Sequence, residues 1–131
     1  MIVLDYLDTS AFLKLVLSEP ESHALRAELA AADTLVSSTL LLVESRRAAA
    51  RYGPLAVART RAALATVTMV PLDDATLEHA ADLEPAELRS LDALHLATAL
   101  SLGDDLTRFF CYDLRLATAA SALGLDVRRP A

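Results

Sequence analysis

Short β-favouring runs alternate along the chain with apolar segments of helical length, and this alternation constrains the fold more than any other feature. The runs with strand character are residues 2–7, 34–38, 67–72, 106–112 and 125–128. Strands joined by helices of ten or more residues pair in parallel through right-handed crossovers. The sequence therefore predicts an α/β fold, a three-layer sandwich in which a mainly parallel sheet of four or five strands is flanked by helices.

The length and composition set the scale of this fold. With 131 residues, of which 54% are hydrophobic and only 5% aromatic, the chain is predicted to form one domain over residues 1–131 with a large aliphatic core. No uncharged apolar run is long enough to cross a bilayer, and Asp5 and Asp8 stand where a signal peptide would carry bases. We therefore expect a cytoplasmic protein with no membrane association.

Charge and cysteine content restrict the possible ligands. The formal net charge of −6 argues against broad electrostatic binding to nucleic acid, although residues 46–61 contain five arginines and no acid. Most such runs only face water, but Arg46 and Arg47 follow Glu44 closely and are candidates to hold phosphate groups. Cys111 is the only cysteine, so a disulfide within the chain and a thiolate zinc site are both excluded.

Four acids lie within or beside apolar patterns in which a carboxylate is poorly explained: Asp8, Glu44, Asp92 and Asp113. Asp8 and Asp113 follow predicted strands, so we expect them at the carboxyl edge of the sheet, where α/β proteins bind ligands. Each acid also has a structural explanation. Asp8 and Asp113 could be helix N-caps. Asp92 could be stabilised by the positive N-terminal end of a helix, and Glu44 could pair with Arg47 one turn later.

If these acids lay close together in space, their carboxylates would repel one another. Two carboxylates about 5 Å apart repel by roughly 3 kcal/mol at an effective dielectric constant of about 20. A cluster must therefore protonate or bind a cation, and oxygen ligands favour Mg²⁺ or Mn²⁺. Such an ion activates water and stabilises the charge that develops when a phosphodiester is hydrolysed.

The ordered set of motifs resembles the PIN-domain ribonucleases, and most of all the VapC toxins of bacterial VapBC toxin–antitoxin modules. The motifs are LDTSAFLKL (7–15), TLLLVESRRA (39–48), RSLDALHLATAL (89–100) and YDLRLATAASALGL (112–125), which together span most of the chain. The resemblance implies a catalytic, metal-binding quartet of Asp8, Glu44, Asp92 and Asp113. It also implies that Thr9 or Ser10 supplies a hydroxyl next to Asp8.

The same resemblance implies an activity and partners. These are metal-dependent cleavage of RNA phosphodiester bonds, with Mg²⁺ or else Mn²⁺ as the cofactor, a homodimer, and inhibition by a VapB-like antitoxin whose tail enters the acidic groove. The chain departs from the family pattern at two positions. Cys111 stands where many relatives have threonine, and Arg115 stands where some have another acid.

Other families fit less well. A receiver domain needs a lysine after a late strand, whereas the only lysine is Lys14. A haloacid-dehalogenase-type phosphatase needs two acids separated by one residue, and Asp5 and Asp8 are one residue too far apart. The remaining alternative is a PIN-like binding or scaffolding subunit with little or no catalytic activity. We expect Asp5 to be structural, and His95 to be a histidine hydrogen-bonded beside the core rather than a catalytic group.

Overall fold

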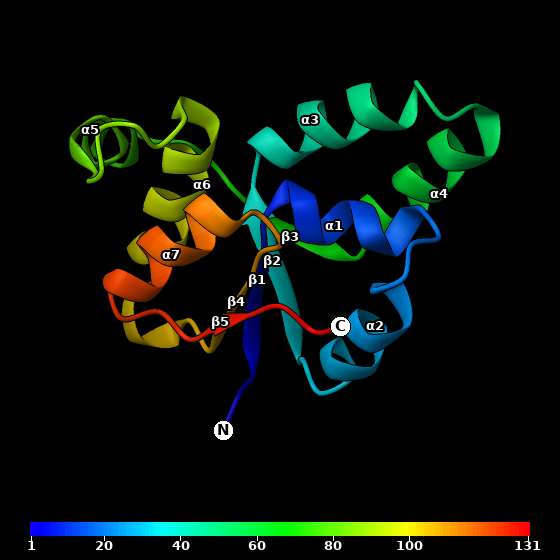
Figure 1. Ribbon diagram of the computed structural model, residues 1–131, viewed down its shortest axis with the longest axis horizontal. Helices are drawn as coiled ribbons and strands as arrows, with labels where there is room; N and C mark the ends of the chain where they lie inside the picture. Colours follow the sequence, from blue (N-terminus) through cyan, green and yellow to red (C-terminus); the bar gives the residue numbers. More distant parts are fainter.

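Five short strands lie at the centre of the fold, and all of them run parallel (Figure 1). The computed structural model describes residues 1–131. The strands are β1 (Leu4–Leu7), β2 (Thr34–Ser38), β3 (Val67–Val70), β4 (Arg108–Phe110) and β5 (Val127–Arg128). Their order across the sheet is β3-β2-β1-β4-β5, so that Tyr6 of the central strand lies between Val36 and Phe109. The predicted parallel sheet is confirmed.

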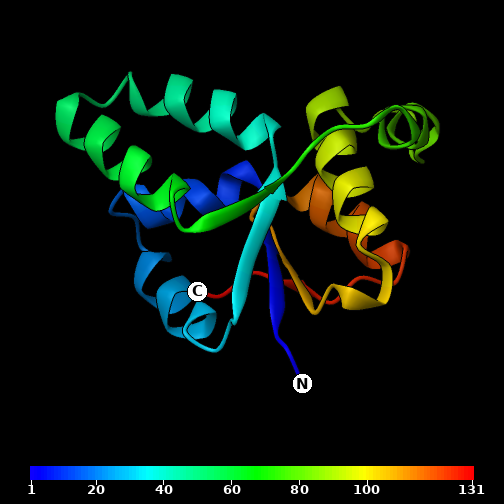
Figure 2. The ribbon, with the colours of Figure 1, turned by 180° about the vertical axis from the view of Figure 1, so that it is seen from behind.

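Helices cover both faces of the sheet (Figures 1 and 2). On one side lie α1 (Thr9–Val16), α2 (Ser22–Leu29), α3 (Leu40–Ala49) and α4 (Pro54–Leu64). On the other side lie α5 (Asp74–Asp82), α6 (Ser90–Ser101) and α7 (Leu114–Ala122), with a short 3-10 turn at Gly103–Asp105. None of these helices combines the length and the apolar character that crossing a bilayer requires.

The central strand places alternate side chains on opposite faces, and each face has its own core. Tyr6 packs with Phe109 and Leu96 beneath α6 and α7, whereas Leu7 packs with Phe12 beneath α1 and its neighbours. A strand buried on both faces needs apolar residues at successive positions rather than alternate ones. This requirement explains why most residues in the runs that predict the strands are apolar.

The observed strands are shorter than most of the predicted runs. Residues 34–38 form β2 as predicted, but within residues 106–112 only Arg108–Phe110 pair as a strand. The backbone N–H of Tyr112 donates to Ser10 Oγ instead of to a neighbouring strand, and Asp113 then begins α7. The chain therefore leaves the sheet at Tyr112, because the backbone N–H of this residue has a side-chain partner at the carboxyl edge.

Candidate active site

Asp8 stands at the carboxyl end of the central strand and is the N-cap of α1. Its Oδ1 accepts from the backbone N–H of Ala11 at 2.9 Å, and the Ser10 hydroxyl donates to Oδ1 and Oδ2 at 2.7 and 2.8 Å. The side chain is almost fully buried, and burial raises the pKa of Asp8, against the hydrogen bonds from Ser10 and Ala11. Because Ser10 Oγ also accepts from Tyr112 N–H at 2.9 Å, this hydroxyl joins Asp8 to the end of β4.

Asp113 is the N-cap of α7, as its position after a strand allowed. Its Oδ1 accepts from the backbone N–H groups of Arg115 and Leu116, both at 3.0 Å. Its Oδ2 points to a different partner and accepts from Nη2 of Arg89 at 3.0 Å. One oxygen of this carboxylate therefore caps a helix while the other faces the site, so the structural and functional interpretations of Asp113 are compatible.

Asp92 lies in the first turn of α6, and the same arginine contacts it. Nε of Arg89 donates to Oδ2 of Asp92 at 2.9 Å. One guanidinium thus holds two acids that are distant in sequence, and the charge of Glu44 also acts on it. Arg89 was not among the residues predicted from the sequence. The sequence feature from which Arg89 could have been identified is its position three residues before Asp92, a spacing at which side chains on a helix meet.

Glu44 reaches the site from α3 and is held by two donors. Its Oε1 accepts from the hydroxyl of Thr9 and from Nε2 of His95, each at 2.8 Å. Partial burial would raise the pKa of Glu44, but the hydrogen bonds from His95 and Thr9 outweigh it and the pKa is lowered. The partner of Glu44 is therefore His95, by a hydrogen bond, and not Arg47, one turn away on the same helix.

The predicted acids therefore gather at one edge of the sheet without forming a ligand shell. Asp92 and Asp113 contact the guanidinium of Arg89, and the charge of Glu44 also acts on it, whereas Asp8 is held by Ser10 and Ala11. As placed, no group of three or more His, Cys, Asp or Glu side chains is close enough together to hold a metal ion. The donor set itself, all carboxylate and hydroxyl oxygen, has the chemistry that a hard divalent cation requires.

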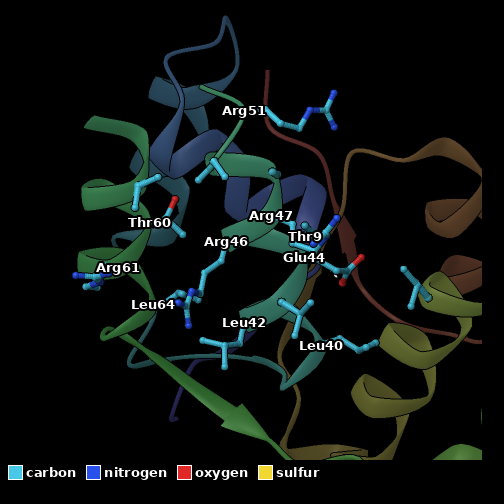
Figure 3. Close-up of a pocket in the computed structure, with 16 residues that line it drawn as sticks. Thr9, Leu40, Leu42, Glu44, Arg46, Arg47, Arg51, Thr60, Arg61 and Leu64 are labelled. Atoms are coloured by element: carbon cyan, nitrogen blue, oxygen red, sulfur yellow. Dashed lines mark hydrogen bonds between the residues drawn. The ribbon is translucent and has the colours of Figure 1, made fainter. Parts of the chain in front are cut away.

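A groove of about 1300 Å³ leads away from Glu44 between α3 and α4 (Figure 3). Thr9 and Glu44 lie together at one end, and four arginines line the groove: Arg46, Arg47, Arg51 and Arg61. Four arginines of the basic segment therefore line one groove, with exposed side chains. The groove brings cationic side chains next to an acidic site, which is the combination that a nucleic-acid phosphate beside a bound cation needs.

Cys111 and Arg115, which differ from the family pattern, lie in different surroundings. Cys111 is fully buried, and its thiol donates to the backbone oxygen of Asp113 at 3.3 Å. Burial and the neighbouring Asp8 raise the pKa of this thiol, so it stays neutral beside the acids. Arg115 follows Asp113 in α7 with an exposed side chain, and its backbone contributes to the cap.

The fold and the site together define the chain as a parallel α/β protein with an acidic centre at the carboxyl edge of its sheet. The sequence model of the PIN domain matches residues 6–120. The chain belongs to the PIN-domain family.

Curated proteins that are similar in sequence indicate one group within the PIN-domain family. Ribonuclease VapC46 of Mycobacterium tuberculosis (strain ATCC 25618 / H37Rv) is 46% identical over 125 residues, which cover 95% of this chain and 96% of that protein. Ribonuclease VapC47 of Mycobacterium tuberculosis (strain CDC 1551 / Oshkosh) is 41% identical over 130 residues, with the same coverage of both chains. The predicted resemblance to VapC ribonucleases is confirmed.

Two solved structures support the fold at lower sequence identity. The crystal structure of Mycobacterium tuberculosis VapC20, described as a sarcin-ricin loop cleaving toxin, superposes with a TM-score of 0.72 at 20% identity, covering 96% of this chain and 99% of that one. VapBC2 from Rickettsia felis, bound to a DNA fragment from its promoter, gives a TM-score of 0.70 at 11% identity, covering 98% of this chain and 100% of that one. The fold is therefore PIN-like over nearly the whole chain.

Proposed function

We propose that this protein is a metal-dependent endoribonuclease that acts as the toxin of a toxin–antitoxin pair. The observation that carries the proposal is the contact of both Asp92 and Asp113 with the guanidinium of Arg89, on which the charge of Glu44 also acts, at the carboxyl edge of the sheet. Carboxylates so arranged need a positive charge, and hydrolysis of RNA by a bound divalent cation makes use of such a cluster. The ribonuclease names of the relatives support the same activity.

The residues have separate roles in this proposal. Asp8, Glu44, Asp92 and Asp113 would hold Mg²⁺ or Mn²⁺, which when bound lowers the pKa of a water molecule and neutralises charge on the phosphate. The hydroxyls of Thr9 and Ser10 donate to Glu44 and Asp8, so they orient carboxylates. Arg46 and Arg47 would hold phosphates of the RNA along the groove.

The proposed partners and location follow from the family. We expect a homodimer in the cytoplasm that is inhibited by a VapB-like antitoxin. A complex named VapBC2 is among the structural neighbours, and the open groove beside Glu44 gives such a partner access to the acids. A test of inhibition is to add the product of a reading frame adjoining this gene to the purified ribonuclease and to measure the loss of cleavage.

The metal requirement can be tested with purified protein free of any partner. RNA cleavage should stop on chelation with EDTA and return with Mg²⁺ or Mn²⁺, and Asp8→Asn and Asp92→Asn should lower it by at least about a hundredfold. Asp104→Asn, a change of the same chemistry at an exposed acid outside the cluster, is the matched control. Cleavage by both site variants at the control rate would exclude the proposal, and RNA binding without cleavage by the unaltered protein would favour a PIN-like binding subunit.

A further inference from the structure

His95 uses both of its ring nitrogens in one chain of hydrogen bonds that runs from the centre of the sheet to the acidic site. Nδ1 lies 2.8 Å from the hydroxyl oxygen of Tyr6, and Nε2 lies 2.8 Å from Oε1 of Glu44. The ring is 1% exposed, and the three residues come from β1, α6 and α3. A histidine that only filled the core would not need a partner at the acidic site.

The chemistry of the partners fixes the direction of this chain. An ionised Glu44 can only accept, so Nε2 of His95 must carry a proton and donate it. Nδ1 lies on the opposite side of the ring and faces the hydroxyl of Tyr6. The hydroxyl of Thr9 gives its single hydrogen to the same Oε1 of Glu44. Tyr6 therefore fixes the orientation of the His95 ring in which Nε2 meets Glu44.

Tyr6 is itself held rigidly. It is fully buried in the central strand, stacks on Phe109 with ring centroids 5.3 Å apart, and meets the His95 ring edge-on at 5.9 Å. The direction of the Glu44 carboxylate is thereby set by the sheet, although Glu44 belongs to a helix and is partly exposed. Both donors engage Oε1, which leaves Oε2 available to a cation.

We propose that His95 is a positioning residue for the acidic site, which holds the Glu44 carboxylate in place through Nε2–H and is itself fixed by the hydroxyl of Tyr6. This inference rests on the proposed function, in which Glu44 takes part in binding a divalent cation. A long glutamate side chain that is already immobilised loses less conformational entropy when it binds. His95 thus raises the affinity for the cation without touching it.

The first experiment measures Mn²⁺ affinity by titration calorimetry in the absence of RNA. Tyr6→Phe removes only the hydroxyl, and His95→Leu removes the donor to Glu44. Each should weaken Mn²⁺ binding by about tenfold. His95→Gln, whose side-chain amide can still donate, should keep an affinity closer to that of the unaltered protein.

A matched control separates positioning from general support of the core. Phe109→Leu disturbs the same packing that Tyr6 makes but reaches no acid of the site. It should lower the melting temperature and leave the affinity for Mn²⁺ unchanged. If His95 were merely structural, Phe109→Leu and His95→Leu would change Mn²⁺ affinity equally for the same loss of thermal stability.

A double-mutant cycle with Glu44→Gln gives the decisive outcome. On that background His95→Leu should cause no further loss of Mn²⁺ affinity, because the carboxylate that His95 positions is gone. Additive losses, or an unchanged affinity in both Tyr6→Phe and His95→Leu, would overturn the role of His95 while leaving the proposed function intact. If the unaltered protein bound no Mn²⁺ at all, the proposed function would fail and this inference with it.

Discussion

Nη2 of Arg89 lies 3.0 Å from Oδ2 of Asp113, and this ion pair joins the residue before α6 to the residue before α7. The same guanidinium contacts Asp92 at 2.9 Å. Its side chain is 64% exposed, so water screens both ion pairs and they add little to the stability of the fold. Their importance lies in the oxygens that they occupy, because these are oxygens that a divalent cation at the same site would use.

Removal of this guanidinium should strengthen cation binding. Arg89→Ala frees Asp92 and Asp113 and leaves their mutual repulsion to be relieved by the metal. Since exposed ion pairs are each worth about 0.2–1 kcal/mol, Mn²⁺ should bind roughly twofold to thirtyfold more tightly, measured by calorimetry without RNA. Arg115→Ala is the control, because Arg115 is also an exposed arginine next to Asp113 but makes no ion pair with it. Equal Mn²⁺ affinity in the two variants would show that Arg89 does not compete with the cation.

The hydroxyl of Ser10 should set both the stability of the site and the pH at which it binds a cation. Ser10→Ala deprives the buried Asp8 of a donor and Tyr112 N–H of its acceptor, which should cost about 1–3 kcal/mol in the free energy of unfolding measured with urea. Thr118→Ala on α7, whose hydroxyl donates only to Leu114 O at an exposed position, should cost much less.

The direction of the pH effect follows from the same hydrogen bonds. Burial raises the pKa of Asp8 and Ser10 lowers it, so Ser10→Ala should raise it further. Because a cation binds the ionised carboxylate, the pH midpoint for Mn²⁺ binding should move upward in Ser10→Ala and stay in place in Thr118→Ala. A downward movement of this midpoint would contradict the assignment of Ser10 as a donor to ionised Asp8.

The groove arginines should contribute to RNA binding and not to metal binding. Charge reversal of Arg46 and Arg47 together should weaken RNA binding in EDTA and reduce the slope of log affinity against log salt by at least about 1, since each phosphate that is neutralised on a single strand accounts for about 0.7 of that slope. Arg59→Glu makes the same kind of change on α4 outside the groove lining and is the control. Mn²⁺ affinity should persist in both variants. RNA affinity that did not depend on Arg46 and Arg47 would remove them from the site.

Local signals explain what the sequence could predict. The strand at 34–38 and the positions of Asp8 and Asp113 depend on apolar runs and on the capping residues that follow them, all within a few residues of one another. Parallel pairing then follows from the helices between the strands. Both acids are N-caps and both lie at the carboxyl edge, so the two interpretations given to them describe the same geometry.

Interactions between distant elements explain what the sequence could not predict. His95 and Glu44 are 51 positions apart, and His95 and Tyr6 are 89 positions apart, so no local pattern could pair them. The prediction that His95 would be hydrogen-bonded beside the core describes one of its nitrogens and omits the other. Arg89 precedes a helix without capping it, and its ion pair with Asp113 depends on how α6 and α7 pack.

Asp5 is the acid of the central strand that the sequence predicts to be structural. It is fully buried near the amino end of β1, and its Oδ1 accepts from Nε of Arg108 at 2.9 Å while its Oδ2 accepts from the same guanidinium. Arg108 is also largely buried and lies over the ring of Phe110, so it has little water to replace a missing carboxylate. Asp5→Asn removes the nearer of the two carboxylates that pair with Arg108, with Glu28 remaining at 3.9 Å, and should lower the free energy of unfolding in urea by up to about 3–5 kcal/mol.

The position of Asp5 makes this loss of stability separable from the chemistry. Asp8 ends the same strand but serves the site at the carboxyl edge, so Asp5→Asn should keep its Mn²⁺ affinity and its rate of RNA cleavage per folded molecule. Asp126→Asn is the control, because Asp126 pairs with Arg128 at a half-exposed position, where an ion pair is worth about 1 kcal/mol or less. If Asp5→Asn were no less stable than Asp126→Asn, the buried pair with Arg108 would not be holding β1 to β4. If it lost Mn²⁺ affinity while still folded, Asp5 and not only Asp8 would belong to the acidic site.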